Sequence, residues 1–63
     1  MKVGDFVKKI NGATVRQDVY VCAPDGTERK LVSFDFNGYP FKEDNKTVRN
    51  INLYDGKVVI NYK

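Results

Sequence analysis

The chain has 63 residues, a formal net charge of +3, one cysteine and no histidine. A chain of this length buries only about 60% of its unfolded surface, so we treat residues 1–63 as a single small domain. Because Cys22 stands alone, an intrachain disulfide is excluded, and a zinc site is not expected without further Cys or His ligands.

Tight-turn signals divide the chain into short segments. Four of the five glycines follow an acidic or amide residue, in the pairs Asn11-Gly12, Asp25-Gly26, Asn37-Gly38 and Asp55-Gly56. Between apolar or alternating segments, such pairs favour β-hairpins, because Asn, Asp and Gly reach positive φ at low steric cost.

The segments between these turns are predicted to be strands. In chain order they cover residues 6–10, 13–23, 27–36, 47–54 and 57–62, with a short extended piece over residues 39–41. Residues 42–46 are interpreted as an exposed loop. The helical alternatives are residues 40–49, which lack an apolar stripe, and a short turn over residues 5–10.

The Asp25-Gly26 hairpin allows two registers. A two-residue turn pairs Val19 with Val32 and gathers valines and phenylalanines, including Phe34, on one apolar face. A three-residue loop that begins at Pro24 moves the pairing by one residue and mixes both faces. Because such a slip turns a whole strand over, the first register is favoured.

The Asp55-Gly56 hairpin separates apolar from polar residues equally well. Its expected pairs are Leu53 with Val58, Ile51 with Ile60, and Arg49 with Tyr62. The opposite face collects Asn50, Asn52, Tyr54, Lys57, Val59 and Asn61. The expected core is Phe6, Ile10, Val15, Val19, Val21, Val32, Phe34, Phe36, Ile51, Leu53, Val58 and Ile60.

The predicted fold class is all-β, a five-stranded antiparallel meander. One apolar sheet face must be covered, and closure into a small SH3-like or OB-like barrel covers it and removes the strand edges. A two-layer sandwich and a face-to-face pair of chains are the alternatives. The tetrapeptide Gly4-Asp5-Phe6-Val7 resembles the opening of many SH3-like barrels, a match of four residues that assigns the chain to no family.

Enzyme chemistry is not expected. The sequence has no histidine to act as a general base near neutral pH, and it has no phosphate-binding glycine loop, nucleophile elbow or cluster of metal ligands. We therefore expect no catalysis, no cofactor and no metal. Without an apolar run of membrane-spanning length or a signal-peptide pattern, we also expect no membrane contact and a cytoplasmic location.

Aromatic and basic residues gather in two places, which form the predicted partner-binding site of a non-catalytic binding module. One is an outward sheet face, and the other is the loop over residues 37–49 with its flanks. The residues are Arg16, Tyr20, Arg29, Tyr39, Phe41, Lys42, Lys46 and Arg49. Tyrosine and arginine dominate the binding energy of many protein interfaces, and cations with stacked rings also hold single-stranded nucleic acid.

A protein partner or self-association is favoured over nucleic acid, because the net charge is modest and the acids are numerous. Single-stranded nucleic-acid binding is the alternative. The strip that contains three asparagines, Asn50, Asn52 and Asn61, stays open between a solvated outer face and a surface for another strand edge or a ligand.

Overall fold

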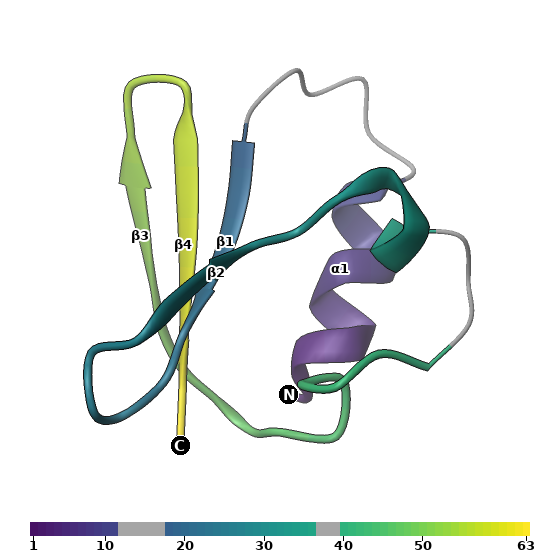
Figure 1. Ribbon diagram of the computed structural model, residues 1–63, viewed down its shortest axis with the longest axis horizontal. Coiled ribbons are helices and arrows are strands. Elements are labelled where there is room, and N and C mark those ends of the chain that lie inside the picture. Colours follow the sequence, from purple (N-terminus) through teal and green to yellow (C-terminus); the bar gives the residue numbers. More distant parts are fainter. Residues whose placement is uncertain (12–17, 37–39) are drawn as a thin grey trace.

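One α-helix and four strands make up the part of the chain that the computed structural model describes, which is residues 1–11, 18–36 and 40–63 (Figure 1). In chain order the elements are α1 (Val3–Asn11), β1 (Asp18–Cys22), β2 (Glu28–Lys30), a 3₁₀ turn η1 (Ser33–Phe36), β3 (Val48–Tyr54) and β4 (Lys57–Tyr62). The strands form one sheet in the order β2-β1-β4-β3. β1 and β4 run parallel, and the other two pairs are antiparallel.

The predicted five-stranded meander, and with it the SH3-like or OB-like barrel, is wrong. The structure is an open mixed sheet with a helix on one face, because β4 returns to the middle of the sheet beside β1. The predicted 27–36 strand contains only the three residues of β2 before the chain turns into η1. The turns expected at Gly12 and at Asn37-Gly38 lie outside the described residues.

The predicted first strand is instead the helix α1. Phe6 and Ile10 fit a strand period, but together with Val3 and Val7 they follow the i, i+3, i+4, i+7 spacing of an amphipathic helix. Asp5 in the first turn also complements the helix dipole. All four apolar side chains belong to the core or pack against it, so burial decides between the two periods.

The start of α1 is held by the 44–46 segment. The Val3 amide donates to the carbonyl of Lys46 at 2.8 Å, and the Gly4 amide donates to the carbonyl of Asp44 at 3.0 Å. These bonds satisfy two of the four amides that a helix start leaves without partners. A Cβ atom placed on Gly4 would lie 2.9 Å from the Cβ of Asp44, so this contact requires glycine.

Replacing Gly4 with alanine should lower the free energy of unfolding by about 1–3 kcal/mol, because the added methyl group must push α1 away from the 44–46 segment. Urea unfolding followed by circular dichroism measures the change. Lys9→Ala, at an exposed position of the same helix, is the control and should leave stability nearly unchanged. A Gly4→Ala chain more stable than wild type would mean that helix propensity outweighs the close contact.

The β1–β2 hairpin adopts the register that the apolar pattern disfavoured. Tyr20 pairs with Lys30 and Cys22 with Glu28, around a three-residue loop in which Gly26 has a φ of 93°. The Ala23 amide donates to the carbonyl of Thr27 at 2.8 Å and closes this loop. The favoured register depended on Phe34 and Phe36 lying in the strand, and both residues lie in η1.

The Asp25 side chain supports the same three-residue loop. One of its carboxylate oxygens accepts the Thr27 amide at 2.9 Å. This hydrogen bond from the backbone lowers the pKa of Asp25 below its ordinary value. Local turn chemistry therefore decided the register against the apolar pattern.

The β3–β4 hairpin confirms the prediction near its turn. Leu53 pairs with Val58 and Ile51 with Ile60, and β4 covers residues 57–62 as expected. The predicted pair of Arg49 with Tyr62 is wrong, because a register shift between Val48 and Asn50 places Val48 opposite Tyr62. Positive φ at this turn is confined to Gly56, at 74°, so the turn is not type I′.

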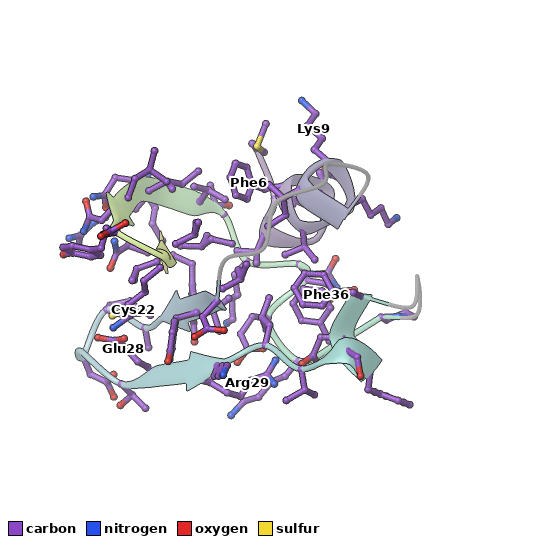
Figure 2. All side chains as sticks on the ribbon, turned by 90° about the horizontal axis from the view of Figure 1, so that it is seen from above. Phe6, Lys9, Cys22, Glu28, Arg29 and Phe36 are labelled. Atoms are coloured by element: carbon purple, nitrogen blue, oxygen red, sulfur yellow. The ribbon has the colours of Figure 1, made fainter. Side chains whose placement is uncertain are left out.

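The core lies between α1 and one face of the sheet. It consists of Val3, Val7, Val19, Val21, Leu31, Val58 and Ile60. Of the expected core residues, Val32, Phe34 and Leu53 are exposed, and Val15 lies outside the described residues. Phe6 and Phe36 pack against the core from the α1 side (Figure 2).

Candidate binding surfaces

The sheet face opposite α1, here called the open face, carries side chains from all four strands. Strand pairing places on it Asp18, Tyr20, Cys22, Glu28, Lys30, Asn50, Asn52, Tyr54, Lys57, Val59 and Asn61. Cys22 and Glu28 lie on the side of the sheet away from α1, and within the described ranges no helix covers this side (Figure 2). Val59 is 5% exposed and is not part of the core cluster.

The charges on the open face cancel. Lys30 lies 3.4 Å from a carboxylate oxygen of Asp18, and Lys57 lies 3.5 Å from one of Glu28. Each exposed pair contributes little to stability, about 0–1 kcal/mol. Two lysines against two acids give this surface no formal charge, although the chain carries +3.

The remaining polar groups of the open face are tyrosines and amides. The Lys57 ammonium lies 4.4 Å from the centre of the Tyr20 ring, a cation–π contact, and Tyr54 is 56% exposed. The side-chain amide of Asn50 donates to the side-chain oxygen of Asn52 at 3.4 Å. The buried Asn61 Nδ2 donates to no acceptor among the residues described, so one donor of this face is unsatisfied.

On the other side of the sheet, Arg29 joins two buried carboxylates. Its guanidinium donates to both oxygens of Glu43, at 2.6 and 3.0 Å, and to both oxygens of Asp35, at 3.2 and 3.5 Å. Asp35 and Glu43 are 7% and 4% exposed. Asp35 also accepts the Val32 amide at 2.8 Å. We call Arg29, Asp35 and Glu43 the ion cluster.

The ion cluster ties three parts of the chain together, since Arg29 comes from β2, Asp35 from η1 and Glu43 from the loop before β3. The bonds to Glu43, more than those to Asp35, raise the pKa of Arg29 above its ordinary value. Because the pKa of Arg29 is higher in the folded than in the unfolded chain, the stability that its charge supplies is fully present at any pH below the unfolded-state pKa. The guanidinium therefore stays charged wherever the protein is folded.

The structure separates the predicted partner-binding residues. Among those in the described ranges, Tyr20 alone lies on the open face, while Arg29 is engaged in the ion cluster on the opposite side. Phe41 packs against the core, and the exposed residues Lys42 and Lys46 belong to the loop that holds the start of α1. Arg49 is exposed at the register shift in β3, and Arg16 and Tyr39 lie outside the described residues.

Sequence reasoning did not find Asp35, Glu43 or Lys30. The predicted 27–36 strand includes Asp35, which lies beyond the true end of β2, and the predicted exposed loop includes Glu43, so the sequence pattern does not indicate their burial with Arg29. The asparagine strip of β3 and β4, by contrast, shares one face as predicted. Its signal was the unusual asparagine content of two strands.

A hollow of about 790 Å³ lies between α1 and the segment that leads into β3. This volume is in the range of ligand pockets. However, its charged walls alternate in sign, with Asp5 beside Lys8 on the helix and Asp44 opposite. The carboxylate of Asp35, a buried acidic group of its lining, is already engaged in the ion cluster, so it is not free to orient a ligand in the hollow.

No helix in residues 1–11, 18–36 and 40–63 is long and apolar enough to cross a membrane. The same residues hold no group of three or more His, Cys, Asp or Glu side chains placed to bind a metal ion. Comparison with known proteins finds no matching family model, no matching curated protein and no matching solved structure. The functional argument therefore rests on the chemistry of these surfaces.

Proposed function

We propose that this chain is a non-catalytic binding module that contacts a protein partner through the open face of its sheet. The observation that carries the proposal is the combination on that face of tyrosines, asparagines and fully paired charges. Tyrosine offers a large contact area at low conformational cost, and asparagine offers adaptable hydrogen bonds, which is the chemistry of many protein-binding surfaces.

The paired charges favour a protein over single-stranded nucleic acid. A nucleic-acid surface needs cations that remain free to neutralise phosphates. Lys30 and Lys57 each already lie beside an acid, and Lys57 also covers the ring of Tyr20, which would have to stack on a base.

Selection of a random peptide library on the immobilised chain tests this proposal. Enriched peptides should lose about 10–100-fold in affinity, measured by calorimetry, when Tyr20 is replaced with alanine. Phe34→Ala is the matched control, because Phe34 is an aromatic residue that is 70% exposed in η1, away from the open face. Circular dichroism checks that both variants fold.

Two outcomes contradict the proposal. One is that no peptide is enriched, or that enriched peptides bind the Tyr20→Ala chain as tightly as wild type. The other is that a fluorescent single-stranded oligonucleotide binds at low salt, weakens steeply as salt rises, and needs Tyr20. That second result would replace the protein partner with nucleic acid. The cytoplasmic location expected from the sequence stays a prediction.

A further inference from the structure

β3 is the last strand of the sheet, and its outer edge is only partly covered. The N-terminal residues cover its beginning. The Val48 amide donates to the carbonyl of Met1 at 2.8 Å, and Lys2 forms an isolated antiparallel β-bridge with Thr47. From Arg49 to Tyr54, no described segment pairs with this edge (Figure 1). A row of backbone donors and acceptors is therefore open to another strand.

The turn identifies which backbone groups face outward. A two-residue loop joins Tyr54 to Lys57, so this pair exchanges backbone hydrogen bonds, and the direction alternates along β3. The backbone amide and carbonyl of Asn52 therefore point toward β4, as those of Tyr54 do. Ile51 and Leu53 direct their amides and carbonyls away from β4, toward the free edge.

The two edges of the sheet differ in how they resist pairing. β2 has three residues and all of them are charged, which blunts its edge. Residues 49–54 of β3 contain neither lysine nor proline. They also present exposed apolar surface, since Leu53 is 74% exposed on the α1 side and Tyr54 is 56% exposed on the open face.

We propose that a second copy of this chain pairs with the free edge of β3, antiparallel, with a two-fold axis at Asn52. In this register Ile51 lies opposite the partner's Leu53, so apolar side chains meet on the α1 side. The two such pairs supply about four backbone hydrogen bonds. Arg49 lies opposite the partner's Asp55, which places opposite charges at both ends of the interface.

Charge and pattern together select this register. A shift by two residues in one direction places Asp55 opposite the partner's Ile51. A shift in the other direction places it opposite the partner's Thr47, where the N-terminal residues already cover the edge. A shift by one residue would bring the two faces of β3 out of alignment. Of these registers, only the one with the two-fold axis at Asn52 brings together both the apolar pairs and the oppositely charged pairs.

The pairing would make one continuous eight-stranded sheet and would place the two open faces side by side. The inference goes beyond the proposed function and does not depend on it, because Tyr20 lies on β1 and the pairing uses only β3 and its turn. Loss of peptide binding and loss of dimerisation are therefore separate results.

Sedimentation equilibrium tests the pairing. The mass of the wild-type chain should rise toward twice the monomer value as its concentration approaches about 1 mM. Arg49→Glu and Asp55→Lys should each weaken association about tenfold, and the double variant should restore it. Lys42→Glu changes an exposed charge outside β3 and its turn and is the control. A wild-type chain that stays monomeric, or a double variant that does not recover, overturns the proposal.

Disulfide trapping tests the register itself in a Cys22→Ser background. With the axis at Asn52, the two copies of Asn52→Cys lie in a pair with a Cα separation of about 4.5 Å, within disulfide range. The two copies of Asn50→Cys lie about 13 Å apart along the strands and serve as the control. We expect rapid disulfide dimers for the first variant only. Equal trapping at both positions, or at neither, overturns the assignment.

Discussion

Replacing Arg29 with alanine is expected to lower the free energy of unfolding by about 2–4 kcal/mol and to leave much of the population unfolded at 37 °C. The change leaves the carboxylates of Asp35 and Glu43 buried without a cation, and breaking a buried ion pair is costly. We place the figure below the usual range for buried pairs because the Arg29 side chain is 38% exposed.

Urea unfolding of variants at two neighbouring residues, Arg29 and Lys30, tests this effect. Lys30→Ala is the control, because the Lys30–Asp18 pair is exposed on both sides and should contribute under about 1 kcal/mol. Arg29→Lys should recover part of the loss only, since an ammonium cannot donate to two carboxylates in the planar geometry of a guanidinium. Equal stability of Arg29→Ala and Lys30→Ala would show that the ion cluster contributes no more than a surface pair.

Replacing Ile60 with alanine is expected to lower the free energy of unfolding by about 2–5 kcal/mol, which is most of the stability of a domain this small. Ile60 is 0% exposed and lies in β4, at the middle of the sheet. It pairs with Val21 of β1 and with Ile51 of β3, so truncation opens a cavity bounded by both neighbours.

The control for this cavity is Phe34→Ala. The apolar pattern placed Phe34 in the core, where truncation would unfold the domain, but Phe34 is 70% exposed. Its replacement should therefore change the free energy of unfolding by about 0.5 kcal/mol at most. If Phe34→Ala destabilised the chain as much as Ile60→Ala, the assignment of the core to the α1 side would be wrong.

The β3–β4 hairpin could be predicted because everything that determines it is local. Asp55 and Gly56 close a two-residue turn, and the strands beside it alternate, so Leu53 and Val58 had one plausible pairing. Even there the register shift near Val48 could not be predicted, because no turn signal lies close to it; the same segment also contacts Met1 and Lys2, which are far away in the sequence.

The helix α1 was missed because short apolar patterns are ambiguous. Phe6, Lys8 and Ile10 alternate as a strand would, and only the addition of Val3 and Val7 reveals the helical period. The parallel pairing of β1 with β4 was missed for a different reason. It joins segments more than thirty positions apart, such as Val19 and Val58, and no local turn signal can encode it.

The candidate surfaces were predicted in part for the same reason. The asparagine strip belongs to one hairpin, so local alternation was enough to place it on a common face. The ion cluster needed the correct end of β2 and a non-local contact with Glu43, neither of which a pattern within one strand contains. The predicted partner-binding site therefore groups Arg29 with Tyr20, although the side chain of Arg29 belongs to the other face of the sheet.

The central position of β4 has a consequence for biosynthesis. β1 and β2 cannot be joined to β3 until β4 occupies the place between them, since β4 separates the two halves of the sheet. A nascent chain that has not yet reached Lys57 thus lacks the strand that completes its apolar layer. We expect most folding of this domain to follow translation of the β3–β4 hairpin, because Val19 and Val21 have no neighbouring strand on that side until β4 is made.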